Sequence, residues 1–175
     1  ATCQMVLDGA VGTLVGQPNK GLQAMFVMMN VARIGVGMQS LGLTEVAFQS
    51  ALAYAKDRIQ FAKPLYAFPR VAGKIAWMAV ETMIARQLTY FAAREKDQDR
   101  RCDIEAGMAK LLAARVAWAA ADNAVQIHGG NGFAIEFPIS RILCDARILS
   151  IFEGADETLC LKVIARRLCE ESKPR

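Results

Sequence analysis

One carboxylate in the C-terminal third of the sequence has the setting of a catalytic base. Glu153 follows an apolar run at residues 148–152 and precedes Gly154, where a helix is expected to begin. Apolar surroundings raise the pKa of a carboxylate toward the range useful for proton abstraction, and a neighbouring glycine leaves room for a substrate. The alternative is a first-turn acidic residue that complements the helix dipole. On these residues alone the helix-dipole role is favoured.

A second segment is rich in glycine, and its residues are Gln126, Ile127, His128, Gly129, Gly130, Asn131, Gly132 and Phe133. Consecutive glycines let a ligand approach the backbone, whose N–H groups suit phosphate or ring-carbonyl oxygens. The segment follows a helix and not a strand, so it is not a Rossmann fingerprint. A glycine cap and turn explain it equally well. His128 is the only histidine, and a lone histidine beside a cap is more often a hydrogen-bonded structural residue than a catalyst.

A third segment, at residues 58–65, joins a helix end to a loop. Arg58, Gln60 and Phe61 place a cation, an amide and an aromatic ring together, which could bind a phosphate and a planar ring. The alternative is an arginine that complements the C-terminal end of the helix dipole, and on these residues alone it is favoured.

The elements that must position these residues are mostly helices. Apolar residues recur at helical spacing, and Pro69 suits a helix first turn. The pattern predicts helices at residues 22–60, 69–95, 104–128, 140–148 and 154–171. Residues 3–15, with Asp8-Gly9 as a turn, predict a β-hairpin. The fold class is therefore all-α, an up-and-down four-helix bundle with a short N-terminal hairpin. Close helix packing is expected at Gly35, Gly37 and Gly42.

Composition excludes several classes of protein. The 175 residues suit one domain, and 54% hydrophobic with 22% charged residues is typical of a globular chain. Five cysteines without a CxxC pair argue for a reducing compartment and against a disulfide framework or zinc site. A net charge of +4 without a recognised motif argues against nucleic-acid binding, and charges interrupt every apolar run before a membrane span is reached. One histidine also argues against a ferritin-like metal bundle.

In this order and spacing, the three segments resemble the acyl-CoA dehydrogenase family. Its motifs are R-x-x-F-G-x-P-L, then Q-I-x-G-G-x-G-[FY], then D-A-[RK]-I followed by [YF]-E-G-[TA]. Here they match residues 58–65, residues 126–133, and residues 145–148 with 152–154. The resemblance covers nearly the whole chain. It implies that residues 1–21 are the end of the middle β domain and that residues 22–175 form the C-terminal helical bundle domain.

The resemblance implies FAD-dependent α,β-desaturation of an acyl-CoA thioester, with Glu153 removing the α-proton. A minority of the family carries the base one residue before the position of Arg33, where this chain has Ala32. Arg33 would contact the CoA portion and Gly154 would line the thioester pocket. The residues implied to bind FAD are Arg58, Gln60, Phe61, Gln126, Ile127, His128, Gly129, Gly130, Ala155 and Glu157, those from 126 to 130 reaching the FAD of a neighbouring subunit.

The same resemblance implies a homo-oligomer (dimer or tetramer), electron-transfer flavoprotein as the electron acceptor, and a cytoplasmic or mitochondrial-matrix location. Three positions depart from the family pattern: Ala62 and Ala155 replace the usual glycine and threonine, and Pro69 replaces the usual glutamine. The chain is expected to be a C-terminal fragment that is inactive alone. Two alternatives stay open, an acyl-CoA oxidase of the same fold and a non-catalytic helical interaction domain.

Overall fold

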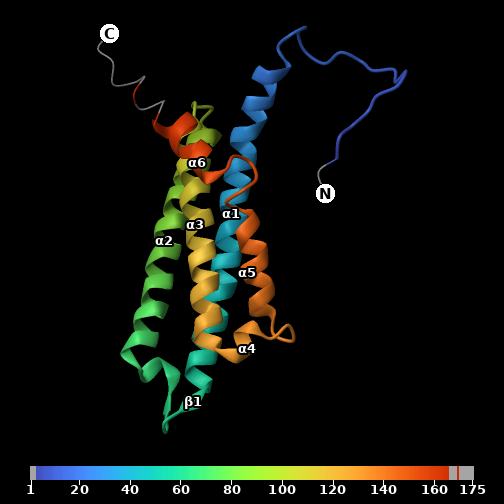
Figure 1. Ribbon diagram of the computed structural model, residues 1–175. Helices are drawn as coiled ribbons and strands as arrows, with labels where there is room; N and C mark the ends of the chain where they lie inside the picture. Colours follow the sequence, from blue (N-terminus) through green and yellow to red (C-terminus); the bar gives the residue numbers. More distant parts are fainter. Residues whose placement is uncertain (1–2, 166–168, 170–175) are drawn as a thin grey trace.

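The computed structural model describes residues 3–165 and 169. It is an elongated helical bundle (Figure 1) built from three long helices and a shorter one. These are α1 (Gly21–Asp57), α2 (Pro69–Asp97), α3 (Asp103–His128) and α5 (Pro138–Ile148). Helix α3 packs against the other three, so it forms the centre of the bundle. The predicted all-α bundle is confirmed.

Short elements close the two ends of the bundle. At the lower end in Figure 1, β1 (Ile59–Gln60) and β2 (Lys63–Pro64) form a two-stranded antiparallel hairpin, followed by the 3₁₀ turn η1 (Leu65–Ala67). Helix α4 (Gly130–Phe133) lies at the same end. At the opposite end, α6 (Asp156–Thr158) continues into the π-helical segment η2 (Leu159–Ala165).

Local sequence explains where the helices begin and end. Pro69 occupies the first turn of α2, where its missing N–H costs nothing. Asp103 and Glu105 lie in the first turn of α3, where acidic residues complement the helix dipole. Helix α3 ends at His128 and is capped by Gly129, whose φ of +60° suits a residue without Cβ.

Small side chains let the helices approach closely. The core is mainly alanine, and the fully buried alanines of α3 are Ala106, Ala109, Ala113, Ala114, Ala117, Ala120, Ala121 and Ala124. Close helix packing is expected from the sequence at three glycines. It is confirmed at Gly37, where an added Cβ would lie 3.2 Å from Cγ2 of Thr89 on α2. The expectation is wrong for Gly35 and Gly42, which are surrounded by open space.

Two predicted elements differ from the structure. Residues 3–20 contain no strand, so the predicted N-terminal hairpin is not formed, and the segment is exposed throughout. An isolated two-stranded hairpin is at best marginally stable, because it has no second layer to bury its apolar face. The last predicted helix begins at Asp156 and not at residue 154, and its end lies outside the described residues.

Helix α1 passes a test of length and composition for a membrane span, with a mean hydropathy of 1.2 over eighteen residues. It is the one such helix in the described part of the chain. A core helix of a folded domain passes the same test. Only 17% of that window is buried in the bundle. Arg33, Ser40 and Thr44 of α1 are buried, whereas Phe26, Met28 and Val31 are more than half exposed. The absence of a membrane span stays a prediction.

Candidate active site

Glu153 lies in a strained loop, residues 149–155, between α5 and α6. Its φ is +54°, and the next residue, Gly154, has a φ of +108°. A non-glycine residue in this region costs on the order of 1–3 kcal/mol and persists only where the surroundings impose it. Such outliers cluster at functional sites, and ordinary turns have them too, as at Phe61 and Ala62 between β1 and β2. The conformation makes Glu153 a candidate, and its contacts decide whether it remains one.

Contacts from two helices hold the loop in that conformation. Nε of Arg33 on α1 donates to the carbonyl oxygen of Glu153 at 3.4 Å. Nζ of Lys110 on α3 donates to the next carbonyl, that of Gly154, at 2.7 Å. A Cβ at Gly154 would lie 3.0 Å from Cδ2 of Leu159, so the Leu159 side chain also packs against the loop. The positions of residues 153 and 154 are therefore fixed through their backbone.

The carboxylate of Glu153, in contrast, is left free. Glu153 is half-buried, and among the described residues its side chain has no hydrogen bond and no ion pair. It lies three residues before Asp156, the first residue of α6. Asp156 and Glu157 are the acidic residues of that first turn, so the role of helix-dipole partner belongs to them and not to Glu153.

Two buried cations contact the loop, so the surroundings of Glu153 are less apolar than the sequence suggested. Lys110 is completely buried and Arg33 is 6% exposed. Burial lowers the pKa of Lys110, and the negative charge of Asp156, at 3.6 Å, partly opposes this. Burial also lowers the pKa of Arg33, against the charges of Asp103 and Glu153. The nearby carboxylates thus partly restore the charged forms that burial disfavours.

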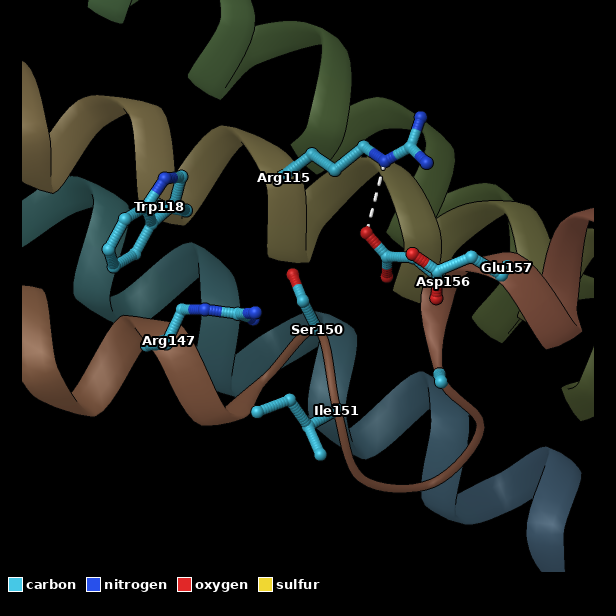
Figure 2. Close-up of a pocket in the computed structure, with 8 residues that line it drawn as sticks. Arg115, Trp118, Arg147, Ser150, Ile151, Asp156 and Glu157 are labelled. Atoms are coloured by element: carbon cyan, nitrogen blue, oxygen red, sulfur yellow. Dashed lines mark hydrogen bonds and ion pairs between the residues drawn. The ribbon is translucent and has the colours of Figure 1, made fainter.

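A hollow of about 370 Å³ opens beside the loop (Figure 2). Its lining residues are Arg115, Trp118, Arg147, Ser150, Ile151, Ala155, Asp156 and Glu157. The guanidinium of Arg147 lies over the Trp118 ring, 5.8 Å from its centroid, and Nε of Arg115 donates to Asp156 at 3.0 Å. The lining combines two guanidinium groups, an indole and a hydroxyl, which suit phosphates and an aromatic ring, with the carboxylates of Asp156 and Glu157. Because Arg115 is already paired with Asp156, Arg147 is the cation of the hollow that has no carboxylate partner among the described residues. The hollow brings together Ala155 and Glu157, both predicted to bind FAD.

The other predicted FAD residues lie at the opposite end of the bundle (Figure 1). Arg58 caps α1 and is exposed, and Gln60 pairs in β1 with Lys63. Phe61 is 88% exposed, and its ring makes an edge contact with the Phe68 ring at 6.4 Å between centroids. Most of the ring is therefore accessible to a planar ligand. Between this end and the Glu153 loop, α3 runs eighteen residues from Lys110 to His128, a span of about 27 Å.

Within the glycine segment, the residues differ in how accessible they are. Gly129 and Gly130 are exposed and Gln126 faces solvent, whereas Ile127 is buried. His128 is buried too, with Nδ1 donating to the Ala124 carbonyl at 2.7 Å. Its ring stacks on Tyr54 at 4.3 Å between centroids. This is the structural role that the sequence favours for a lone histidine, so its side chain is occupied inside the bundle.

Sequence reasoning missed the polar residues that support the loop, Lys110, Arg115 and Asp156. It also missed Asn30, whose Oδ1 accepts a hydrogen bond from Arg33 at 3.1 Å. Lys110 had a readable signal. It lies four residues after Ala106 and three before Ala113, on the face of α3 that is buried. A lysine on the apolar face of an alanine-rich helix must find a buried partner.

Residues 19–169 match the family model of the C-terminal domain of acyl-CoA dehydrogenases. The chain belongs to the acyl-CoA dehydrogenase family. It is 58% identical to (2S)-methylsuccinyl-CoA dehydrogenase of Cereibacter sphaeroides, over 92% of this chain and 29% of that protein. It is 38% identical to an acyl-CoA dehydrogenase of Bacillus subtilis, over 89% of this chain and 42% of that protein. The chain thus spans less than half of the length of these relatives.

Solved structures of the family have the same fold. Butyryl-CoA dehydrogenase from Megasphaera elsdenii superposes with a TM-score of 0.86 at 38% identity, over 88% of this chain and 40% of that one. An acyl-CoA dehydrogenase from Geobacillus kaustophilus superposes with a TM-score of 0.85 at 28% identity, over 88% of this chain and 40% of that one. The resemblance seen in the three sequence motifs is confirmed at the level of family and fold.

Proposed function

We propose that the whole protein desaturates an acyl-CoA thioester between its α- and β-carbons, with Glu153 as the base. The observation that carries the proposal is the geometry of the Glu153 loop. Two helices hold its backbone in a strained conformation, while the carboxylate is left without a partner among the described residues. A side chain placed in this way is available to accept a proton from a ligand.

The reaction removes two hydrogens from adjacent carbons. Glu153 accepts the α-proton as the Cα–H bond breaks, and the electron pair of that bond forms the new double bond. The β-hydrogen leaves with its own electron pair as a hydride. FAD, when bound, supplies the acceptor for this hydride. The protein's own contribution is the base, its orientation and a site of controlled shape.

The residues present fit a shared flavin. The hollow lined by Ala155 and Glu157 offers the guanidinium of Arg147, while that of Arg115 is paired with Asp156. The opposite end of the bundle offers the exposed Phe61 ring and the exposed Gly129 and Gly130. The separation of about 27 Å along α3 between the two ends supports a homo-oligomer, in which each flavin contacts two chains. Arg33, which holds the Glu153 carbonyl, is proposed as part of the acyl-CoA site with Gly154.

For the substrate, we propose a branched acyl-CoA with a second carboxylate, of the (2S)-methylsuccinyl-CoA kind. The support is the 58% identity to the Cereibacter sphaeroides relative, against 38% for the Megasphaera elsdenii enzyme named as short-chain specific. With the full-length protein, kcat/KM for (2S)-methylsuccinyl-CoA is expected to exceed that for butyryl-CoA by at least about tenfold. A preference for butyryl-CoA would overturn this assignment and leave the reaction class intact.

The electron acceptor is proposed to be electron-transfer flavoprotein. One relative, from Acetobacterium woodii, is named as a subunit of a caffeyl-CoA reductase–Etf complex. Reoxidation of the substrate-reduced enzyme should be fast with electron-transfer flavoprotein and slow with dissolved oxygen. Rapid reoxidation by oxygen, with release of hydrogen peroxide, would identify an oxidase.

The base is tested by Glu153→Gln in the full-length protein. Glutamine keeps the shape of the side chain but cannot accept the proton, so the rate of flavin reduction by acyl-CoA should fall by about 10²–10⁴-fold or more. FAD content and ligand binding should persist. The matched control is Glu81→Gln on α2, which should reduce its flavin at the wild-type rate. If Glu153→Gln does so as well, the base lies elsewhere.

A further inference from the structure

The feature that the proposed reaction does not use is a fully buried lysine, Lys110, in the N-terminal third of α3. Its side chain is 0% exposed, and it is the largest fully buried side chain among the described residues. A buried ammonium is unfavourable unless it is paired and hydrogen-bonded. Lys110 has two partners, the Gly154 carbonyl at 2.7 Å and the Asp156 carboxylate at 3.6 Å.

Both partners belong to the segment that carries Glu153. Gly154 directly follows the proposed base, and Asp156 begins α6 two residues later. The N–H of Asp156 donates to the Ser150 carbonyl at 3.2 Å, which joins the two ends of the loop. One ammonium group on α3 thus holds the loop at two points, on either side of Ala155.

The arrangement around Asp156 shows that this contact is a specific one. Asp156 is 8% exposed, and its Oδ2 accepts a hydrogen bond from Arg115 at 3.0 Å (Figure 2). Its Oδ1 is buried without a hydrogen-bond partner in the described part of the chain, and the closest cation is Lys110. The carboxylate is therefore shared between an outer arginine and an inner lysine, and only the lysine also binds the loop backbone.

We propose that Lys110 is a positioning residue for the reaction: through the Gly154 carbonyl and Asp156 it holds Glu153 where its carboxylate can reach the α-proton. The inference rests on the proposed role of Glu153. Because Glu153 and Gly154 both have positive φ, the loop would relax if this anchor were lost, and the carboxylate would move with it. A displacement of about 1 Å at a reacting group can cost on the order of 10²-fold in rate.

The test uses full-length, FAD-loaded enzyme and two readouts, kcat for flavin reduction and α-proton exchange. The exchange probe is an acyl-CoA with sulfur in place of the β-carbon, which can lose its α-proton in D₂O but cannot give up a hydride. Lys110→Met removes the ammonium at similar volume and should lower both rates by about 10–100-fold, with KM and FAD content within about twofold. Lys110→Gln keeps an N–H donor but not the charge, so it should recover part of the loss and stay several-fold slower than wild type.

Lys74→Met is the matched control, because Lys74 donates to Asn123 between α2 and α3 away from the loop. It should keep wild-type rates per bound FAD. If Lys110→Met keeps kcat and exchange within about twofold of wild type, Lys110 supports only the fold and the inference is wrong. If Lys110→Met does not load FAD, Lys110→Gln and Asp156→Asn decide in its place: each should slow exchange several-fold, and unchanged exchange in both overturns the inference.

Glu153→Gln separates this inference from the proposal on which it rests. Exchange lost in Glu153→Gln but retained in Lys110→Met refutes the positioning role alone. Exchange retained in Glu153→Gln refutes the assignment of the base, and with it the reason to expect any effect of Lys110 on proton transfer.

Discussion

Among the glycines of the glycine segment, Gly132 is expected to tolerate substitution by a larger residue least. A Cβ added there would lie 2.5 Å from the Val125 carbonyl oxygen, 2.8 Å from the Val125 Cα and 3.0 Å from the His128 Cβ. The first two are backbone atoms of the last turn of α3. The same carbonyl accepts the hydrogen bond from Gly129 N that caps the helix, at 3.0 Å. Alanine at position 132 can be accommodated only by moving this turn.

The expected cost of Gly132→Ala follows from these contacts. Overpacking costs about 1–3 kcal/mol, and a weakened capping hydrogen bond adds about 1 kcal/mol. The free energy of unfolding should therefore fall by about 2–4 kcal/mol. In a domain of this size that corresponds to a fall in Tm of about 5–15 °C.

Gly73→Ala provides a matched control of opposite sign. Gly73 lies inside α2, and apart from its own helix backbone and chain neighbours no heavy atom comes within 4 Å of an added Cβ. Alanine there should raise the free energy of unfolding by about 0.5–1 kcal/mol, because it restricts the unfolded chain and favours the helix. Urea unfolding followed by far-UV circular dichroism measures both variants. A Gly132→Ala protein within about 0.5 kcal/mol of wild type would show that the turn after α3 yields easily and that the steric reasoning is wrong.

Three further predictions concern other parts of the chain. Ala62 has a φ of +62° in the turn between β1 and β2, a conformation that costs less for glycine than for alanine. Ala62→Gly should therefore raise the free energy of unfolding by about 0.5–1 kcal/mol in the same urea assay. No gain would mean that the turn is unstrained. The full-length protein should self-associate through the faces flanking the glycine segment, where Phe133 is 83% and Ile135 91% exposed. Sedimentation should therefore show Phe133→Ser weakening a dimer or tetramer, and a monomeric wild type would contradict this. Burial lowers the pKa of Lys110, so the unfolded chain binds this proton more tightly than the folded protein does. The free energy of unfolding of wild type, relative to that of Lys110→Met, should therefore rise with pH up to the usual lysine pKa of 10.5. Unfolding midpoints of the two proteins between pH 7 and 10.5 test that sign.

The long helices could be predicted from sequence because their signals are local. Pro69 at the start of α2 and Gly129 at the end of α3 mark helix boundaries by backbone preference alone. The predicted ends of the three long helices lie within about three residues of those in the structure. The N-terminal hairpin failed for the opposite reason, because strand formation at residues 3–15 depends on partners that the local sequence does not contain.

For the glycines too, the backbone conformation could be predicted from local sequence, whereas the packing against other helices could not. Gly129 has a positive φ, which its place after a helix predicts. Gly37 and Gly35 look alike in sequence, yet only Gly37 faces another helix, at Thr89. Which glycine faces a neighbour depends on the rotation of α1 in the bundle, and that rotation is decided by packing over the whole helix.

The candidate base illustrates how tertiary contacts change an interpretation. In sequence, Glu153 beside a helix start is more simply explained as a dipole partner. The fold removes that explanation, because α6 begins at Asp156 and the Glu153 backbone has a left-handed conformation that no capping role requires. The conformation is maintained by Arg33 and Lys110, which lie 120 and 44 residues away from their loop partners. Cations so distant in sequence cannot be assigned to a loop by spacing, but a buried charge must have a partner. A lysine on the buried face of an alanine-rich helix is therefore a signal, readable in the amino-acid sequence, that a polar backbone segment or a carboxylate packs against that face.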